Sequence, residues 1–112
     1  MHQVDKQIGQ RLQEARIKAG LTLRALATKI GMDHSTLSSY ETGRRSLSIP
    51  RLIEIAQALG HSPASFLVAT PEAAVVVDYI DGDAERCLQV GLFLEALDDD
   101  TPEPAESEGR TR

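Results

Sequence analysis

The sequence has little of what stabilises or anchors secreted and membrane proteins. It contains a single cysteine, Cys87, which cannot form an intrachain disulfide. A disulfide-stapled secreted domain is therefore excluded, and a reducing, cytoplasmic location is expected. No apolar run approaches the roughly eighteen residues of a membrane span, and the N-terminus lacks the pattern of a signal peptide. Tryptophan is absent and aromatic residues make up 4% of the chain, so we expect an aliphatic core.

The residue patterns of common enzyme sites are also missing. The histidines, His2, His34 and His61, have no cysteine or carboxylate cluster at metal-ligand spacing. Neither a phosphate-binding glycine-rich loop nor a nucleophile elbow occurs. Cys87 falls on an apolar helix face and is interpreted as a small buried hydrophobe rather than a redox sensor. The sequence thus predicts no enzyme, no catalytic residue, no metal and no cofactor.

The net charge of −5 hides two halves of opposite sign. Residues 1–69 hold nine Lys or Arg against five Asp or Glu, which gives +4. Residues 70–112 hold three Arg against twelve acids, which gives −9 and restores the total. A charge of +4 on residues 1–69 also fits an ordinary solvated surface. The whole-chain charge would argue against nucleic-acid binding, but the distribution of charge between the two halves favours it.

Residues 22–45, TLRALATKIGMDHSTLSSYETGRR, predict two short helices joined by a tight turn. Thr22 can cap the first helix, over residues 22–30, and Asp33 the second, over residues 33–42. Gly31 lies between them, where a helix end needs a residue that tolerates the left-handed conformation. Two helices joined by so short a glycine-containing turn are typical of the helix-turn-helix, which places its second helix in the DNA major groove.

Three more helices are expected around this pair. The first covers about residues 5–19, another starts near residue 49 and ends at Gly60, and Ser62 caps a short fifth helix. Their spacing predicts a common aliphatic core within a domain of residues 1–69. The apolar residues expected to face inward include Ile8, Leu12, Ala15, Ile17, Leu26, Leu37, Tyr40, Ile49, Leu52, Ile55, Leu59, Phe66 and Leu67.

The C-terminal half has a different pattern. Residues 73–80, AAVVVDYI, are β-branched in the middle, which slightly favours a short strand or extended segment over a helix. A helix over residues 84–97 is apolar over more of its circumference than one small domain can cover. Residues 70–97 are therefore a candidate dimerisation or partner-binding segment, and residues 98–112 are expected to form a disordered acidic tail. The predicted interface residues are Val75, Val77, Leu88, Leu92 and Leu94.

Three stretches carry a family resemblance that covers Ile8 to Leu67. They read RLQEARIKAGLTLRALA, KIGMDHSTLSSYETGRRSLSI and RLIEIAQALGHSPASFL. They resemble the phage-repressor-like, or Xre/Cro-type, helix-turn-helix family. The resemblance implies an all-α, five-helix repressor-like domain that binds double-stranded DNA. One departure is Leu23, which stands where the family commonly has a glutamine that helps to anchor a phosphate.

The resemblance also implies roles for individual residues. The base-reading positions fall on His34, Ser35, Ser38 and Ser39. Serine discriminates bases weakly and this helix lacks Arg, Asn and Gln, so we expect modest direct readout. For the serines, the alternative is an ordinary solvated helix face. Arg16 and Glu41 match a buried structural ion pair, and the phosphate-contacting positions are Thr22, Arg24, Lys29, Arg44 and Arg45.

Two functional hypotheses follow from these observations. The first is a sequence-specific transcriptional regulator, most simply a repressor, which binds a two-fold related operator as a homodimer. The second is an antitoxin-like protein, which neutralises a protein partner through residues 73–97 and regulates its own expression through the helix-turn-helix. Double-stranded DNA is the expected partner in both.

Overall fold

In the computed structural model of the protein, which describes residues 3–100, helices begin where side chains cap their first backbone N–H groups. Thr22 Oγ1 accepts a hydrogen bond from Ala25 N at 3.0 Å, and Ser48 Oγ accepts one from Arg51 N at 3.2 Å. Gly60, with φ of +78°, ends a helix in the left-handed conformation that glycine adopts at little cost. Short polar residues and glycine thus set the helix boundaries.

All regular structure between residues 3 and 100 is helical, which confirms the all-α prediction. The strand expected within residues 73–80 is wrong, because a helix covers that segment. The elements are α1 (Gln3–Lys18), α2 (Leu23–Lys29), α3 (His34–Glu41), α4 (Ile49–Leu59), the 3₁₀ helix η1 (Pro63–Phe66), α5 (Pro71–Ile80) and α6 (Ala84–Asp100). The acidic tail predicted for residues 98–112 lies mostly outside the described residues.

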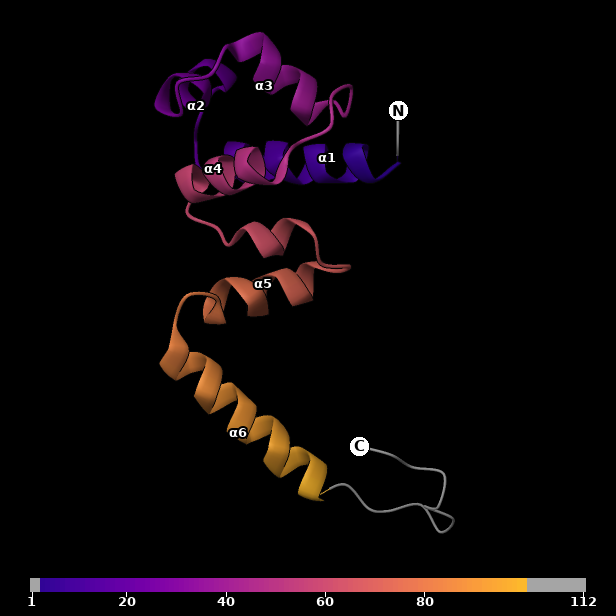
Figure 1. Ribbon diagram of the computed structural model, residues 1–112, viewed down its shortest axis with the longest axis vertical. Coiled ribbons are helices and arrows are strands. Elements are labelled where there is room, and N and C mark those ends of the chain that lie inside the picture. The colour runs from indigo at the N-terminus through magenta and orange to yellow at the C-terminus, as the bar shows by residue number, and fades with distance from the viewer. Residues whose placement is uncertain (1–2, 101–112) are drawn as a thin grey trace. The chain divides into compact units, whose positions relative to one another are not determined.

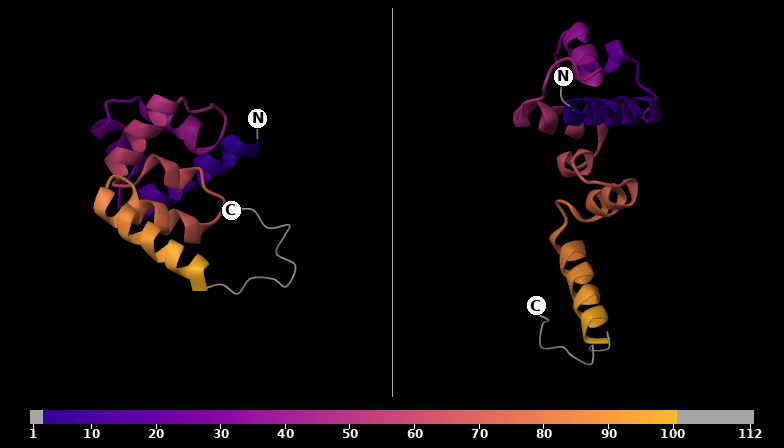
Figure 2. Two further views of the ribbon diagram at one scale, coloured as in Figure 1. Left: turned by 60° about the horizontal axis from the view of Figure 1, so that its bottom comes forward. Right: turned by 90° about the vertical axis from the view of Figure 1, so that its right-hand side faces the viewer.

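Internal contacts divide the chain between Tyr79 and Ile80 into two units, so the first unit extends past the boundary expected at residue 69. Within the first unit, α2 and α3 lie on one side of α1 and α4, and η1 and α5 lie on the other (Figures 1 and 2). Helices α2 and α3 are therefore supported by the domain from one side only, and their other side is open to solvent.

The core of the first unit lies between these layers and is aliphatic, as predicted. Leu12, Leu26, Leu37 and Ile55 are fully buried, and Phe66 closes the core on the η1 side. Three residues expected inside are instead more than half exposed: Ile17, Ile49 and Leu67. Each occurs at or near a helix end, where the apolar pattern continues past the last neighbour that could cover it.

Helix α5 forms despite its three consecutive valines because it has a cap and a tertiary anchor. Thr70 Oγ1 accepts a hydrogen bond from Ala73 N at 3.1 Å. Asp78, on the inner side of α5, lies 2.6 Å from His61 Nδ1 through Oδ2 and accepts from Ser62 N at 2.8 Å through Oδ1. These bonds tie the helix to the segment after α4, and they outweigh the modest strand preference of β-branched residues.

The second unit contains α6, which Asp83 caps by accepting from Arg86 N at 3.0 Å. Cys87 is exposed, so the prediction of a buried cysteine is wrong; its Sγ donates instead to the carbonyl oxygen of Ile80. None of the helices within residues 3–100 is both long and apolar enough to cross a membrane. The large apolar side chains of α6 are mostly exposed, namely Leu88, Leu92, Phe93, Leu94 and Leu97.

Candidate nucleic-acid interface

The turn between α2 and α3 is fixed by the backbone rather than by long side chains. Gly31 N donates to the carbonyl of Thr28 at 3.2 Å, and Met32 N donates to Ala27 O at 2.8 Å. Gly31 has φ of +68°, a conformation that side chains rarely tolerate. Met32 is buried in the core directly after it. The angle between the two helices is thus set by a glycine and an apolar anchor.

Helix α3 has an inner and an outer face. Leu37, Tyr40 and Glu41 are buried on the inner face. Ser35, Ser38 and Ser39, three of the four predicted base-reading residues, lie on the other face, and His34 lies at its edge, three residues before the buried Leu37. Ser35 is exposed, whereas His34, Ser38 and Ser39 are partly exposed. We refer to these four residues as the reading row.

Two hydroxyl groups of the reading row already donate within the protein. Ser35 Oγ donates to the carboxylate of Asp33, and Ser39 Oγ donates to the carbonyl oxygen of Ser35 at 3.1 Å. The Asp33 carboxylate also caps α3, since Oδ2 accepts from Ser35 N at 3.2 Å. Chiefly the hydroxyl bond from Ser35 lowers the pKa of Asp33, so this carboxylate is ionised at neutral pH.

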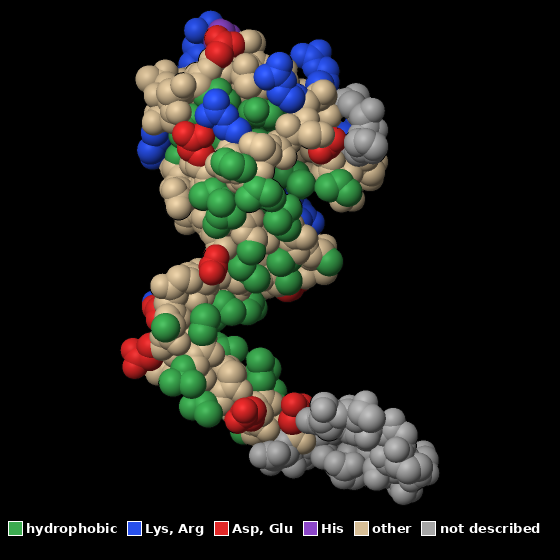
Figure 3. Space-filling view, viewed as in Figure 1, with side chains coloured by type: hydrophobic (Ala, Val, Ile, Leu, Met, Phe, Trp, Pro, Cys, Tyr) green, Lys and Arg blue, Asp and Glu red, His purple; other side chains and the backbone are tan. Residues whose placement is uncertain are grey.

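Basic residues surround the reading row. Arg44 and Arg45 are exposed in the loop after α3, and both of their backbone N–H groups donate to Ser39 O, at 3.0 and 3.2 Å. Arg24 is exposed on α2. Figure 3 shows Lys and Arg side chains gathered over the α2–α3 part of the first unit. The loop backbone is therefore held in place while its guanidinium groups remain available to a phosphate.

Two other residues predicted to contact phosphate already form hydrogen bonds within the protein. Thr22 is exposed and its oxygen accepts the cap bond, which leaves its hydroxyl proton for an outside acceptor. Lys29 Nζ donates to the carbonyl oxygen of Ala58 near the end of α4, at 3.1 Å. Lys29 thus joins α2 to α4 through one of the three donors of its ammonium group.

Arg16 and Glu41 form a two-pronged ion pair beneath the reading row. Arg16 Nε lies 2.7 Å from Glu41 Oε2, and Nη2 lies 3.1 Å from Oε1. Their side chains are 11% and 4% exposed. Arg16 Nη1 also donates to Leu21 O at 2.8 Å, so the pair joins α1, the loop before α2 and the end of α3. Neither charge is placed to contact DNA.

Arg11, which by its charge alone is a weak candidate for a phosphate contact, is bonded within the protein. Its Nη1 donates to the carbonyl oxygens of Phe66 and Val68, at 3.0 and 2.6 Å. This contact closes the end of η1 against α1, and it spans more than fifty residues of sequence. The charge pattern contained no signal for it, since Arg11 looks like any exposed arginine on an amphipathic helix.

The predicted interface residues occur in both units. Val75 is 70% exposed on α5, and Val77 on the same helix is partly buried. The remaining three, on α6, are all more than half exposed: Leu88, Leu92 and Leu94.

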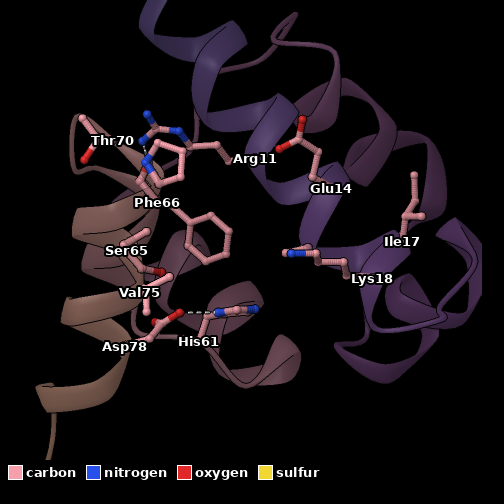
Figure 4. Close-up of a pocket in the computed structure, with 13 residues that line it drawn as sticks. Arg11, Glu14, Ile17, Lys18, His61, Ser65, Phe66, Thr70, Val75 and Asp78 are labelled. Atoms are coloured by element: carbon pink, nitrogen blue, oxygen red, sulfur yellow. Dashed lines mark hydrogen bonds and ion pairs between the residues drawn. The ribbon is translucent and has the colours of Figure 1, made fainter.

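A hollow of about 530 Å³ lies in the first unit between α1 and α5 (Figure 4). Phe66 and the His61–Asp78 pair line it on the η1 and α5 side, and Lys18 reaches toward them from α1. The exposed side chains of Ile17 and Val75 also line this hollow. It lies behind α1 as seen from α3, and so it is separate from the reading row.

Comparison with known proteins agrees with this geometry. A family model described as Helix-turn-helix matches residues 12–66. An HTH-type transcriptional regulator of Sinorhizobium fredii is 36% identical over 67 residues, which are 60% of this chain and 87% of that protein. The chain belongs to the Xre/Cro-type helix-turn-helix family. The matched region of this helix-turn-helix protein includes all of α2, α3 and the arginine-containing loop.

Two longer relatives are similar to this helix-turn-helix protein over more residues. A transcriptional regulator in the ATPase CF(0) region of Rhodospirillum rubrum is 35% identical over 86 residues, or 77% of this chain and 67% of that protein. An HTH-type transcriptional regulator of Rickettsia prowazekii is 33% identical over 73 residues, or 65% of this chain and 56% of that protein. The matched region thus spans about two thirds of the first relative and little more than half of the second.

Proposed function

We propose that the protein is a sequence-specific DNA-binding transcriptional regulator, and most simply a repressor that blocks polymerase by occupying its site. One observation carries the proposal: a helix-turn-helix presents the reading row to solvent and places Arg44 and Arg45 directly beside it. Base edges are read by hydrogen-bonding side chains that enter the major groove, and phosphates are bound by mobile positive charge at its border. Relatives named as transcriptional regulators support the same function, which in bacteria is exercised in the cytoplasm.

We further propose that two copies bind a two-fold related operator. One serine-rich recognition helix offers few strong base contacts, whereas two helices about one DNA turn apart double the contacts and fix the spacing. The exposed apolar side chains of α6, including Leu88 and Leu92, supply a surface for such a dimer. In the first unit, α5 offers the exposed Val75. Exposed apolar surface of this kind is typical of an interface.

Selection of bound sequences from a random DNA pool with the full chain tests the first proposal. We expect enrichment of a two-fold related site whose half-site centres are about 34–36 Å apart. Binding should weaken steeply with salt, because each phosphate contact releases condensed counterions. No enrichment over the input pool would refute sequence-specific binding.

The mass of the purified chain in solution tests the dimer. We expect a dimer at micromolar concentration, and Leu92→Glu should convert it to a monomer because a charge would be buried in an apolar interface. Gln89→Glu is the matched control, since it adds the same charge to an exposed polar position of α6. A wild-type monomer would contradict the homodimer, and would favour the antitoxin-like alternative in which α6 binds a different protein.

A further inference from the structure

Asp33, Ser35 and Ser39, at the start of α3, offer hydrogen-bond acceptors, whereas His34 and Ser38 beside them also carry donors. A serine hydroxyl has one proton to donate and two lone pairs that accept. The protons of Ser35 and Ser39 are both used within the helix, by the Asp33 carboxylate and by Ser35 O. The oxygen atoms of both serines therefore face a ligand with their lone pairs.

Asp33 adds the strongest acceptor to this surface. An ionised carboxylate has about four lone-pair sites and no donor. Oδ2 accepts both bonds from Ser35, and the backbone N–H of Thr36 adds a weaker contact. At least one site of this exposed side chain remains for an outside donor. Asp33 thus caps the helix and also carries a negative charge next to the reading row.

From this arrangement we infer that Asp33, with Ser35 and Ser39, selects bases that carry an exocyclic amine, namely cytosine through N4 or adenine through N6. The inference rests on the proposed function, because it requires α3 to lie in the major groove. In that groove these amines are the hydrogen-bond donors, whereas guanine N7 and O6 and thymine O4 accept. When one of these oxygen atoms faces an acceptor of guanine or thymine, both groups are desolvated and neither is paired. Guanine and thymine are therefore disfavoured at these positions.

The charge of Asp33 also affects affinity for DNA of any sequence. The phosphates that border the major groove repel a carboxylate, and this repulsion is present at every site. Only a base amine compensates for it. Asp33 therefore lowers non-specific binding and strengthens the preference for sites that place cytosine or adenine beside it.

Asp33→Asn is the decisive variant. Asparagine caps helices about as well as aspartate, so α3 should keep its start and the melting temperature should change little. It removes the charge and adds an amide N–H₂ donor. Selection from a random pool with the full wild-type chain should enrich one base pair at the position of each half-site that Asp33 contacts. The variant should enrich a different pair there, because an amide donor favours guanine or thymine on the contacted strand, with relative affinities changed about tenfold.

Two further variants separate base reading from other effects. Glu14→Gln makes the same change in net charge on the α1 side that lines the hollow, away from α3. It should leave the selected sequence unchanged. Ser39→Ala removes one acceptor and should relax the preference at a second position without changing the first.

The outcomes distinguish this inference from the function on which it rests. If wild type selects no DNA, the proposed function fails and the inference fails with it. If wild type selects a site and Asp33→Asn selects the same site, the inference alone is overturned.

Discussion

The backbone of α1 at Gly9 touches the carbonyl oxygen of Tyr40 in α3. A Cβ atom at Gly9 would lie 2.3 Å from that oxygen and 2.5 Å from the carbonyl oxygen of Glu41. Both distances are far shorter than a carbon–oxygen contact allows, and neither partner is a flexible side chain. The separation of α1 and α3, and with it the position of the reading row, is therefore set by contact between two backbones.

Gly9→Ala should destabilise the first unit. The added methyl group forces α1 and α3 apart, and overpacking of this kind costs about 1–3 kcal/mol. The melting temperature followed by circular dichroism should fall by roughly 5 °C or more. Gly91→Ala in α6 is the matched control, because nothing lies within 4 Å of its Cβ position. An unchanged melting temperature for Gly9→Ala would show that the contact can relax.

Glu41→Ala should lower the free energy of unfolding of the domain more than the loss of an exposed ion pair does. It leaves Arg16, whose side chain is 11% exposed, without its partner, and breaking a buried pair costs about 3–5 kcal/mol. Glu54→Ala is the control: it removes the exposed surface pair with Arg51 and should change the stability little, because solvent screens this pair. Urea unfolding of both variants gives the comparison, and equal losses would refute the structural role of Glu41.

Arg44→Ala should weaken binding to all DNA sequences by a similar factor. A phosphate contact carries no sequence information, and its loss reduces the slope of log K against log salt by about one. Lys18→Ala, on the side of α1 that faces the hollow, should leave the slope unchanged. A loss of affinity confined to one base pair would instead make Arg44 a base reader.

Asp78→Asn should loosen α5. Burial raises the pKa of Asp78, but the hydrogen bonds from His61 and Ser62 lower the pKa by more than burial raises it. The pKa therefore lies below its ordinary value of 3.8. The anchor therefore contributes stability above about pH 4 and loses it as the pH falls through the lowered pKa.

The free energy of unfolding of wild type and Asp78→Asn, measured from pH 7 to pH 3, checks this prediction. Wild type should be more stable by about 1–3 kcal/mol at neutral pH, with the difference shrinking in acid. Glu72→Gln, at the first turn of α5, is the control. A difference that does not depend on pH would exclude the carboxylate as the cause.

The helix-turn-helix was predictable because its signals are local. The caps at Thr22 and Asp33 and the left-handed Gly31 lie within a few residues of the helix ends that they define. Apolar spacing then identifies the inner face of each helix. Hydrogen bonds of this kind depend on sequence separation of two to four residues, which the sequence displays directly.

The features that sequence reasoning missed depend on partners far along the chain. Helix α5 has a strand-like composition, and its anchor from Asp78 to His61 joins residues seventeen positions apart. Gly9 looks like an ordinary glycine until α3 is placed against it. Asp33 was recognised as a cap, but the bond that its carboxylate accepts from the Ser35 hydroxyl appears only in the structure.

In helix α3, the residues that pack in the core are different from the residues that face solvent. Leu37, Tyr40 and Glu41 hold the helix in the domain, and the backbone contact at Gly9 sets its distance from α1. The reading row takes part in none of these contacts. Exchange of the outward side chains therefore leaves the core contacts of α3 in place, so that such a protein can be retargeted to new sites.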